Sequence, residues 1–175
     1  MNKVINSDVI AATFDSVYEF NDISKQFDKE PVSGVDLQID LIFEELTETI
    51  SAMDAGLSEL RNKDFKECEV ELLDGAVDVF VVVSGLLQKL QNCGFDVETA
   101  LQRVADNNLS KFPTKIPPQD INWYTSQGWE NEYNHKYNRF VIRDKNGKTR
   151  KSVEFVPVIL DDLVPGNFFK GTQNV

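Results

Sequence analysis

The chain has 175 residues, of which 41% are hydrophobic, and a formal net charge of −11. This length and apolar content suffice for one domain with a hydrophobic core and a small appendage. The negative charge argues against binding nucleic-acid phosphates as the main function. It is still compatible with a small polyphosphate ligand, because a bound metal ion reverses the local field.

Targeting and redox signals are sparse. No apolar run approaches the roughly 20 residues that a membrane-spanning helix requires. Residues 1–6 contain no apolar signal-peptide core, so we expect a cytoplasmic protein. The two cysteines, Cys68 and Cys93, fit no metal-ligand spacing, and we interpret them as reduced structural residues.

The first third of the chain has the periodicity of amphipathic helices. Apolar residues at helical spacing predict a first helix over about residues 7–24, with Ser7 or Asp8 as its cap. Residues 27–34 contain a proline and a glycine and are expected to form a connector. A second helix is predicted over residues 36–53.

Two more helices follow. The third is predicted over residues 64–91, and it is apolar on nearly every side between Val79 and Leu87. That half should therefore lie at the centre of a bundle. Gly94 ends this helix, and a fourth helix is predicted over residues 97–108. The pattern predicts an all-α fold with a four-helix bundle as its core.

The composition changes after the fourth helix, where prolines interrupt the helical pattern and aromatic residues become frequent. Residues 140–145 and 151–156 are prone to form strands, and they flank Asn146-Gly147, which is a hairpin-turn sequence. We therefore expect a helical domain over residues 1–112. An extension over residues 113–175, partly irregular, would contain a β-hairpin.

Two groups of acidic residues lie on the second and third predicted helices. At about 100° per residue, the acids of each helix gather on one side. They are Glu44, Glu45 and Glu48 on the second helix, and Glu71, Asp74 and Asp78 on the third. Six carboxylates on neighbouring helices repel one another unless positive charge lies between them. The simplest alternative is that these acids form solvated helix faces.

Three features favour a metal site over a solvated face. Leu37 and Leu41 precede Glu44 and Glu48 on the same line of the second helix, so this face is not simply polar. Asp78 lies at the start of the apolar run, where a lone carboxylate would be costly. Both helices also carry like charges at i and i+4 without a Lys or Arg between them. Oxygen ligands alone suit Mg²⁺ or Mn²⁺.

Three ordered motifs resemble those of an enzyme family. Residues 44–48 (EELTE) match an EExxE pattern, and residues 71–74 (ELLD) match ExxD. Both patterns are typical of MazG-like all-α nucleoside triphosphate pyrophosphohydrolases. Residues 74–85 look more similar to the phosphoribosyl-ATP-pyrophosphohydrolase-like branch, which includes phage proteins. Residues 108–111 (NLSK) resemble the closing NxSK signature of that branch. The resemblance covers about residues 17–111.

The resemblance implies an activity and an assembly. A (deoxy)nucleoside triphosphate would be cleaved between its α- and β-phosphates, giving the monophosphate and pyrophosphate, in nucleotide-pool control. A homodimer or homotetramer is implied as well, which agrees with a third helix that needs more cover than one short chain gives. A phage-encoded member would act in the host cytoplasm. Neither nucleic acid nor a membrane is expected as a partner.

The resemblance also suggests roles for the acids. The residues expected to hold Mg²⁺ (or Mn²⁺) against the phosphates are Glu45, Glu48, Asp74 and Asp78. Glu44 would bind another ion or help to deprotonate the attacking water. Glu44 and Glu48 are therefore the expected catalytic residues.

The second acidic group can be matched to the family in two registers. The literal match pairs Glu71 with Asp74. Matching Asp78 and Gly85 instead places Gly75 where the family has a glutamate, so Asp74 would supply the missing carboxylate. We favour the second register because Asp78 begins the apolar run, as the family's aspartate does. Glu71 is kept as an additional ligand.

Four further residues are candidates for binding the substrate. Lys111 would contact phosphate, and Asn108 would orient phosphate or sugar. Asn21 lies on the first helix, which lines part of the base pocket in the family, and Lys151 belongs to a basic hairpin. Each has an ordinary structural alternative as a helix-end, core or solvated residue. The competing function is a non-catalytic helical oligomer that serves as an interaction module.

Overall fold

The computed structural model describes residues 4–58, 65–153 and 155–170. The chain divides into two compact units, one formed by residues 1–97 with 164–175 and the other by residues 98–163. The fold is mostly helical and carries one small antiparallel sheet near the C-terminus. This confirms the expected helical character. No helix within the described ranges is long and apolar enough to cross a membrane.

The first helix, α1, spans Ser7–Ile23, as the sequence predicts. Its cap differs from the prediction of Ser7 or Asp8, because Asn6 takes this role. The Asn6 side chain accepts a hydrogen bond from the backbone N–H of Asp8 at 2.9 Å. The backbone N–H of Asp8, which has no partner within the helix, is thereby satisfied. The capping residue lies one position before the predicted Ser7.

The second helix, α2, spans Pro31–Leu57 and starts well before the predicted residue 36. A short 3-10 turn, η1 (Gln26–Asp28), precedes it. Pro31 occupies the first turn, where its missing N–H and fixed φ are no disadvantage. The Glu30 carboxylate caps the helix by accepting two backbone hydrogen bonds. The predicted connector at residues 27–34 is therefore too long, since the proline begins a helix instead of preventing one.

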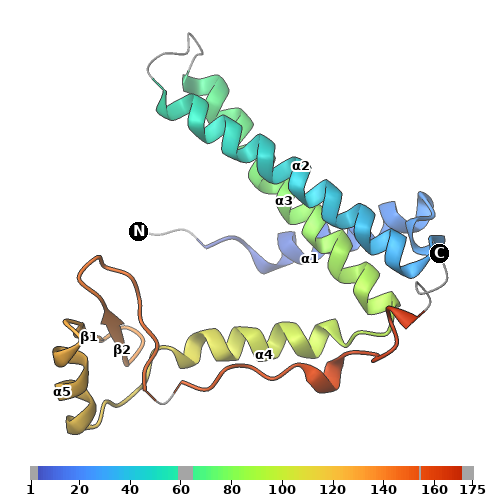
Figure 1. Ribbon diagram of the computed structural model, residues 1–175. Helices are drawn as coiled ribbons and strands as arrows, with labels where there is room; N and C mark the ends of the chain where they lie inside the picture. Colours follow the sequence, from blue (N-terminus) through green and yellow to red (C-terminus); the bar gives the residue numbers. More distant parts are fainter. Residues whose placement is uncertain (1–3, 59–64, 154, 171–175) are drawn as a thin grey trace. The chain divides into compact units, whose positions relative to one another are not determined.

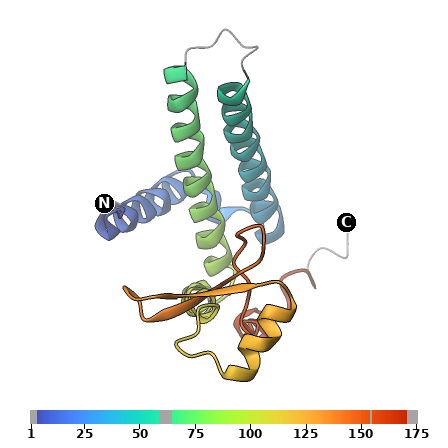
Figure 2. The same ribbon diagram turned by 90° about the vertical axis from the view of Figure 1, so that its left-hand side faces the viewer.

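The third helix, α3, spans Phe65–Asn92 and runs antiparallel to α2, side by side with it (Figures 1 and 2). Contacts at three glycines show the register from one end of this helix pair to the other. They are Gly34 with Lys89, Gly75 with Thr49, and Gly56 with Cys68. At Gly75 the missing side chain lets the two backbones approach each other, since a Cβ there would lie 3.2 Å from the Thr49 Cα.

The contact of α1 with the second half of α3 is polar. The Gln88 side-chain amide donates a hydrogen bond to the carbonyl of Phe14 at 2.8 Å. The Lys89 ammonium is buried and donates hydrogen bonds to three backbone carbonyls of the segment that joins α1 to α2. These bonds satisfy groups that would otherwise be costly to bury.

The helix α4 spans Val97–Ser110 and confirms the fourth predicted helix. From Glu98 onward it belongs to the second unit. The predicted four-helix bundle therefore remains a prediction. The second unit also contains α5 (Pro118–Ser126), which the sequence analysis did not predict, and the 3-10 turn η2 (Asp161–Leu163).

The sheet of the second unit consists of β1 (Glu130–Asn134) and β2 (Arg139–Arg143), paired antiparallel. A C-terminal hairpin is thus confirmed, but its predicted strand pairing is wrong. The segment at 140–145 pairs with β1, and none of the described residues within 151–156 pairs with it. The Asn146-Gly147 turn leads only to an isolated bridge between Arg143 and Thr149.

Candidate functional site

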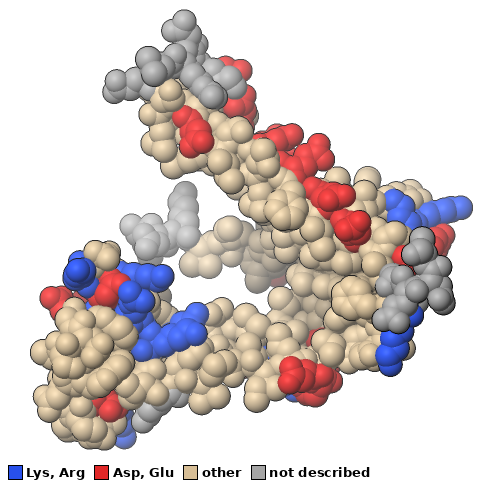
Figure 3. Space-filling model, viewed as in Figure 1, with Lys and Arg blue, Asp and Glu red and all other residues tan. Residues whose placement is uncertain are grey.

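The six acids of the two predicted groups lie along the α2–α3 helix pair, and Figure 3 shows acidic side chains following it. The close contact of Gly75 with Thr49 shows that these two residues lie opposite each other on α3 and α2. Asp74 precedes the glycine in the chain, and Glu48 precedes the threonine. Packing of small residues therefore carries the carboxylates of the two helices toward each other.

The pKa of Glu45 reflects the negative charge that surrounds this residue. Its side chain is half-buried. The pKa of Glu45 is raised above the ordinary glutamate value, first by burial and then by the negative charges of other carboxylates. In decreasing order of influence, they are Asp78, Glu48, Glu44 and Asp74. Five of the six predicted acids thus form one electrostatic group, which we call the Glu45 cluster: Glu44, Glu45, Glu48, Asp74 and Asp78.

A cleft of about 320 Å³ adjoins the Glu45 cluster on the α2–α3 helix pair. Its acidic lining residues are Glu48, Glu71 and Asp74, and its other lining residues are Ser51, Ala52, Ala55 and Gly75. The residues that distinguish the two registers, Asp78 and Glu71, have different surroundings. Asp78 acts on Glu45, whereas Glu71 lines the cleft. Glu48 and Asp74 belong to both sets.

The chemistry of this donor set fits a hard divalent cation. The cluster offers only carboxylate oxygens, which Mg²⁺ and Mn²⁺ prefer, and a cation would offset the negative charges that, after burial, raise the Glu45 pKa. Within residues 4–58, 65–153 and 155–170, no three His, Cys, Asp or Glu side chains converge as a preformed metal site. The metal ion therefore remains a prediction.

Asn21, the substrate candidate of α1, is only 5% exposed. Its side-chain Nδ2 donates a long hydrogen bond of 3.5 Å to Gln88 Oε1. Gln38 of α2 is buried at the same place, because a Cβ on Gly85 would meet both the Gln38 and the Asn21 amides. Asn21 thus belongs to an amide cluster supplied by three helices.

Gln38 and Gln88 were not predicted from the sequence as part of the site. A signal existed, since Gln38 lies seven residues before Glu45, which is two turns along the same line of α2. Asp78 and Gly85 repeat this spacing on α3. The amide cluster and the Glu45 cluster are therefore about 10 Å apart along the α2–α3 helix pair.

The other three substrate candidates belong to the second unit. The structure brings two of them together, because Lys111 Nζ donates a hydrogen bond to Asn108 Oδ1 at 2.6 Å. Lys151 lies apart from this pair in the sequence, and its ammonium is 4.2 Å from the ring centroid of Phe155. Lys111 and Lys151 are thus both held by a neighbouring side chain.

Comparisons with known proteins give no match. Neither a family model, nor a curated protein, nor a solved structure matches this chain.

Proposed function

We propose that the protein is a Mg²⁺-dependent nucleotide pyrophosphohydrolase that converts a (deoxy)nucleoside triphosphate to the monophosphate and pyrophosphate. The observation that supports this most is the Glu45 cluster, in which burial and then the negative charges of carboxylates on α2 and α3 raise the pKa of Glu45. Such uncompensated negative charge indicates a place for cations. The motif resemblance of residues 17–111 supplies the reaction type.

In this proposal, Glu45, Glu48, Asp74 and Asp78 hold the metal, with Glu71 as an additional ligand from the cleft. Bound Mg²⁺ or Mn²⁺ would neutralise phosphate charge and lower the pKa of a coordinated water. Glu44 is an exposed member of the Glu45 cluster, and its carboxylate would accept a proton from the attacking water.

The remaining candidates would bind the substrate. The Lys111 ammonium keeps N–H donors beyond the one given to Asn108, and these would contact phosphate. Asn108 would fix the position of this lysine, and Lys151 would add positive charge. Asn21 would contact the base from the amide cluster, whose carboxamides both donate and accept hydrogen bonds.

We also propose that the protein acts in the cytoplasm as a homodimer or homotetramer. One face of α2 is apolar yet exposed, at 38–70% for each side chain. Its residues are Ile39, Phe43, Leu46, Ile50, Met53 and Leu57. They follow each other by four and three residues in alternation, which is the spacing of a helix seam in coiled coils. The same face supports the competing proposal, a non-catalytic oligomer that acts as an interaction module.

One assay separates the two functions. The protein is incubated with a panel of NTPs and dNTPs plus Mg²⁺, and pyrophosphate release is measured. Glu48→Gln and Asp78→Asn should each abolish turnover while circular dichroism shows unchanged helix content. A folded protein that releases no pyrophosphate from any nucleotide and binds no Mn²⁺ would contradict the enzyme. Activity that survives both substitutions would contradict the site.

A further inference from the structure

A second cavity lies wholly within the second unit, between the end of α4 and the β1–β2 hairpin. Its volume is about 520 Å³, within the range of small-molecule pockets. Its lining residues are Leu109, Phe112, Asn134, Tyr137, Arg139 and Val141. No step of the proposed hydrolysis uses this cavity, which we call the hairpin pocket.

Backbone hydrogen bonds fix the walls of the hairpin pocket. The Arg139 guanidinium donates to the carbonyls of Leu109 and Phe112 at 3.3 and 2.8 Å. The Phe140 N–H donates to the carbonyl of Pro113 at 2.8 Å. These bonds attach β2 to the end of α4 and the residues that follow it, so the two sides of the pocket are held together.

The turn between the strands positions the aromatic wall. Asn134 Oδ1 accepts hydrogen bonds from the N–H groups of Lys136 and Tyr137, at 3.1 and 3.3 Å. Tyr137 is nevertheless 62% exposed, and Leu109 is 55% exposed. Large apolar side chains are thus ordered around an open cavity, where a ligand would remove them from water.

The chain segment that supplies Tyr137, Arg139 and Val141 to the hairpin pocket is rich in positive charge. Residues 136–151 contain seven Lys or Arg residues and one acidic residue, Asp144. Basic side chains gather over the β1–β2 region in Figure 3. Asp144 pairs with Arg150, and Lys136 and Arg139 form no ion pair with any described carboxylate. A ligand that carries negative charge is therefore favoured beside the apolar walls.

We propose that the hairpin pocket binds a nucleoside monophosphate-like ligand, an aromatic ring that carries a phosphate. The ring lies among the apolar walls, beside the aromatic side chains of Phe112 and Tyr137. One face of the Tyr137 ring carries the Lys136 ammonium, 4.7 Å from its centroid. The Asn134 amide donates to the polar edge of the ring. The phosphate lies toward Lys136 and Arg139. This site goes beyond the proposed hydrolysis and does not depend on it.

The test uses the full chain with labelled methyl groups and no divalent cation. The four common nucleoside monophosphates are titrated while the NMR signals of Leu109 and Val141 are followed. At least one monophosphate should shift both signals and bind at least ten-fold more tightly than its nucleoside. Leu109→Arg, which places a large side chain in the pocket, should abolish the shifts of the Val141 signal.

Leu101→Arg is the matched control, because Leu101 lies on the same helix, is 50% exposed and does not line the hairpin pocket. It should leave binding unchanged. No shift with any monophosphate, or unchanged binding in Leu109→Arg, overturns the proposal, as does equal affinity for the nucleosides. Asp78→Asn separates the two sites, since it should end turnover while the monophosphate still shifts the Leu109 and Val141 signals.

Discussion

Gly75 of α3 lies so close to Thr49 of α2 that a Cβ on the glycine would be 2.6 Å from the Thr49 Oγ1. The threonine hydroxyl is already engaged, because it donates a hydrogen bond to the Glu45 carbonyl at 2.8 Å. The same contact lies next to Asp74 and Glu48 in the two helices. Absence of a side chain at one position thus allows the helix approach that assembles the Glu45 cluster.

Gly75→Ala should therefore destabilise the protein. An added methyl group here forces the helices apart or displaces Thr49, at a cost of about 1–3 kcal/mol. The better helix propensity of alanine returns up to about 1 kcal/mol of this. Urea denaturation followed by circular dichroism should show a lower midpoint than for the wild-type protein.

Gly56→Ala on α2 is the matched control for this effect. A Cβ there would lie 3.6 Å from the Cys68 Cβ, which is an ordinary packing distance. This substitution should be neutral or stabilising by up to about 1 kcal/mol, since alanine favours the helix. Equal midpoints for the two variants would show that the Gly75 contact is not tight in solution.

The raised pKa of Glu45 predicts a pH-dependent stability. The unfolded glutamate has an ordinary pKa, so the folded state holds its proton to a higher pH than the unfolded state. The resulting contribution to stability is fully present below the ordinary glutamate pKa, and it is lost as the pH rises through the raised pKa of Glu45 in the folded protein. Glu45→Gln should therefore raise the Tm at pH 7, and its advantage over the wild-type protein should vanish at about pH 4.

A control for this pH dependence is Glu19→Gln, which removes one negative charge from α1. Glu19 is not among the carboxylates that act on Glu45. Its substitution should leave the change of Tm between pH 4 and pH 7 as in the wild-type protein. If both variants gain the same Tm at neutral pH, net charge and not the Glu45 cluster is responsible.

Divalent cations should stabilise the protein through the same cluster. A cation that binds the folded state alone raises its stability, by about 2.7 kcal/mol at a concentration of one hundred times Kd. Mn²⁺ should raise the wild-type Tm more than KCl at equal ionic strength does. Asp78→Asn should lose most of this difference, because it removes one of the charges that act on Glu45. Equal effects of the two salts would argue against a metal site.

The helices of the first unit could be predicted because their apolar periodicity extends over many turns. The ends were harder to predict, because single residues decide them. Pro31 and Pro118 look like helix breakers in sequence, yet each occupies the first turn of a helix, where a proline loses no hydrogen bond. Local composition therefore hid both the early start of α2 and the whole of α5.

Parts of the sheet and of the site could not be predicted from the sequence, because they depend on contacts between distant segments. β1 reads Glu-Asn-Glu-Tyr-Asn and has no strongly apolar alternation, so only its pairing with β2 identifies it as a strand. The acids were found by their helical spacing. The register between α2 and α3 depends on contacts such as Gly75 with Thr49, which no single-helix pattern contains. The hairpin pocket likewise depends on long-range bonds from Arg139.

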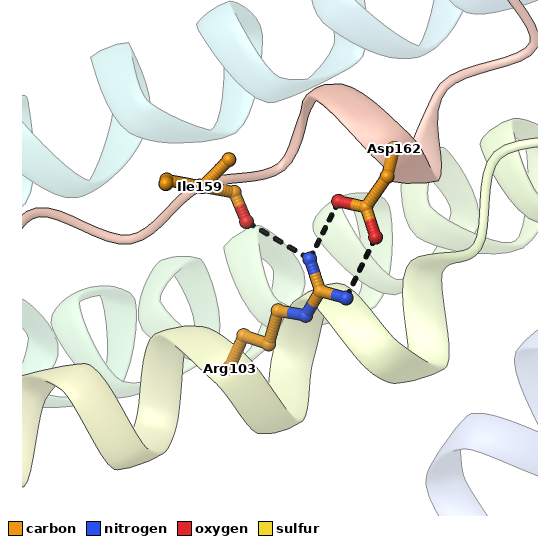
Figure 4. A network of polar contacts seen from close by, with 3 residues as sticks. All are labelled: Arg103, Ile159 and Asp162. Carbon is orange, nitrogen blue, oxygen red and sulfur yellow. Dashed lines mark hydrogen bonds and ion pairs between the residues drawn. The ribbon is translucent and has the colours of Figure 1, made fainter.

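Arg103 of α4 holds the segment that follows the hairpin (Figure 4). Its guanidinium contacts both Asp162 oxygens, at 2.6 and 2.8 Å, and also donates to the carbonyl of Ile159 at 3.0 Å. The pKa of Asp162 is lowered, chiefly because Arg103 donates hydrogen bonds to the carboxylate. The flat, forked guanidinium places two nitrogens opposite the two carboxylate oxygens, a paired geometry that the ammonium of lysine does not reproduce.

Arg103→Lys should therefore loosen residues 156–163 almost as much as Arg103→Met does. Amide hydrogen exchange there should rise by up to about five-fold at pH 7, as expected for an exposed ion pair. Because the folded Asp162 pKa is lowered, the stabilisation exists above the ordinary aspartate pKa and is lost as the pH falls through the folded value. The variants and the wild-type protein should thus converge in acid. Wild-type exchange in Arg103→Lys would instead show that charge alone, without the forked geometry, holds the segment.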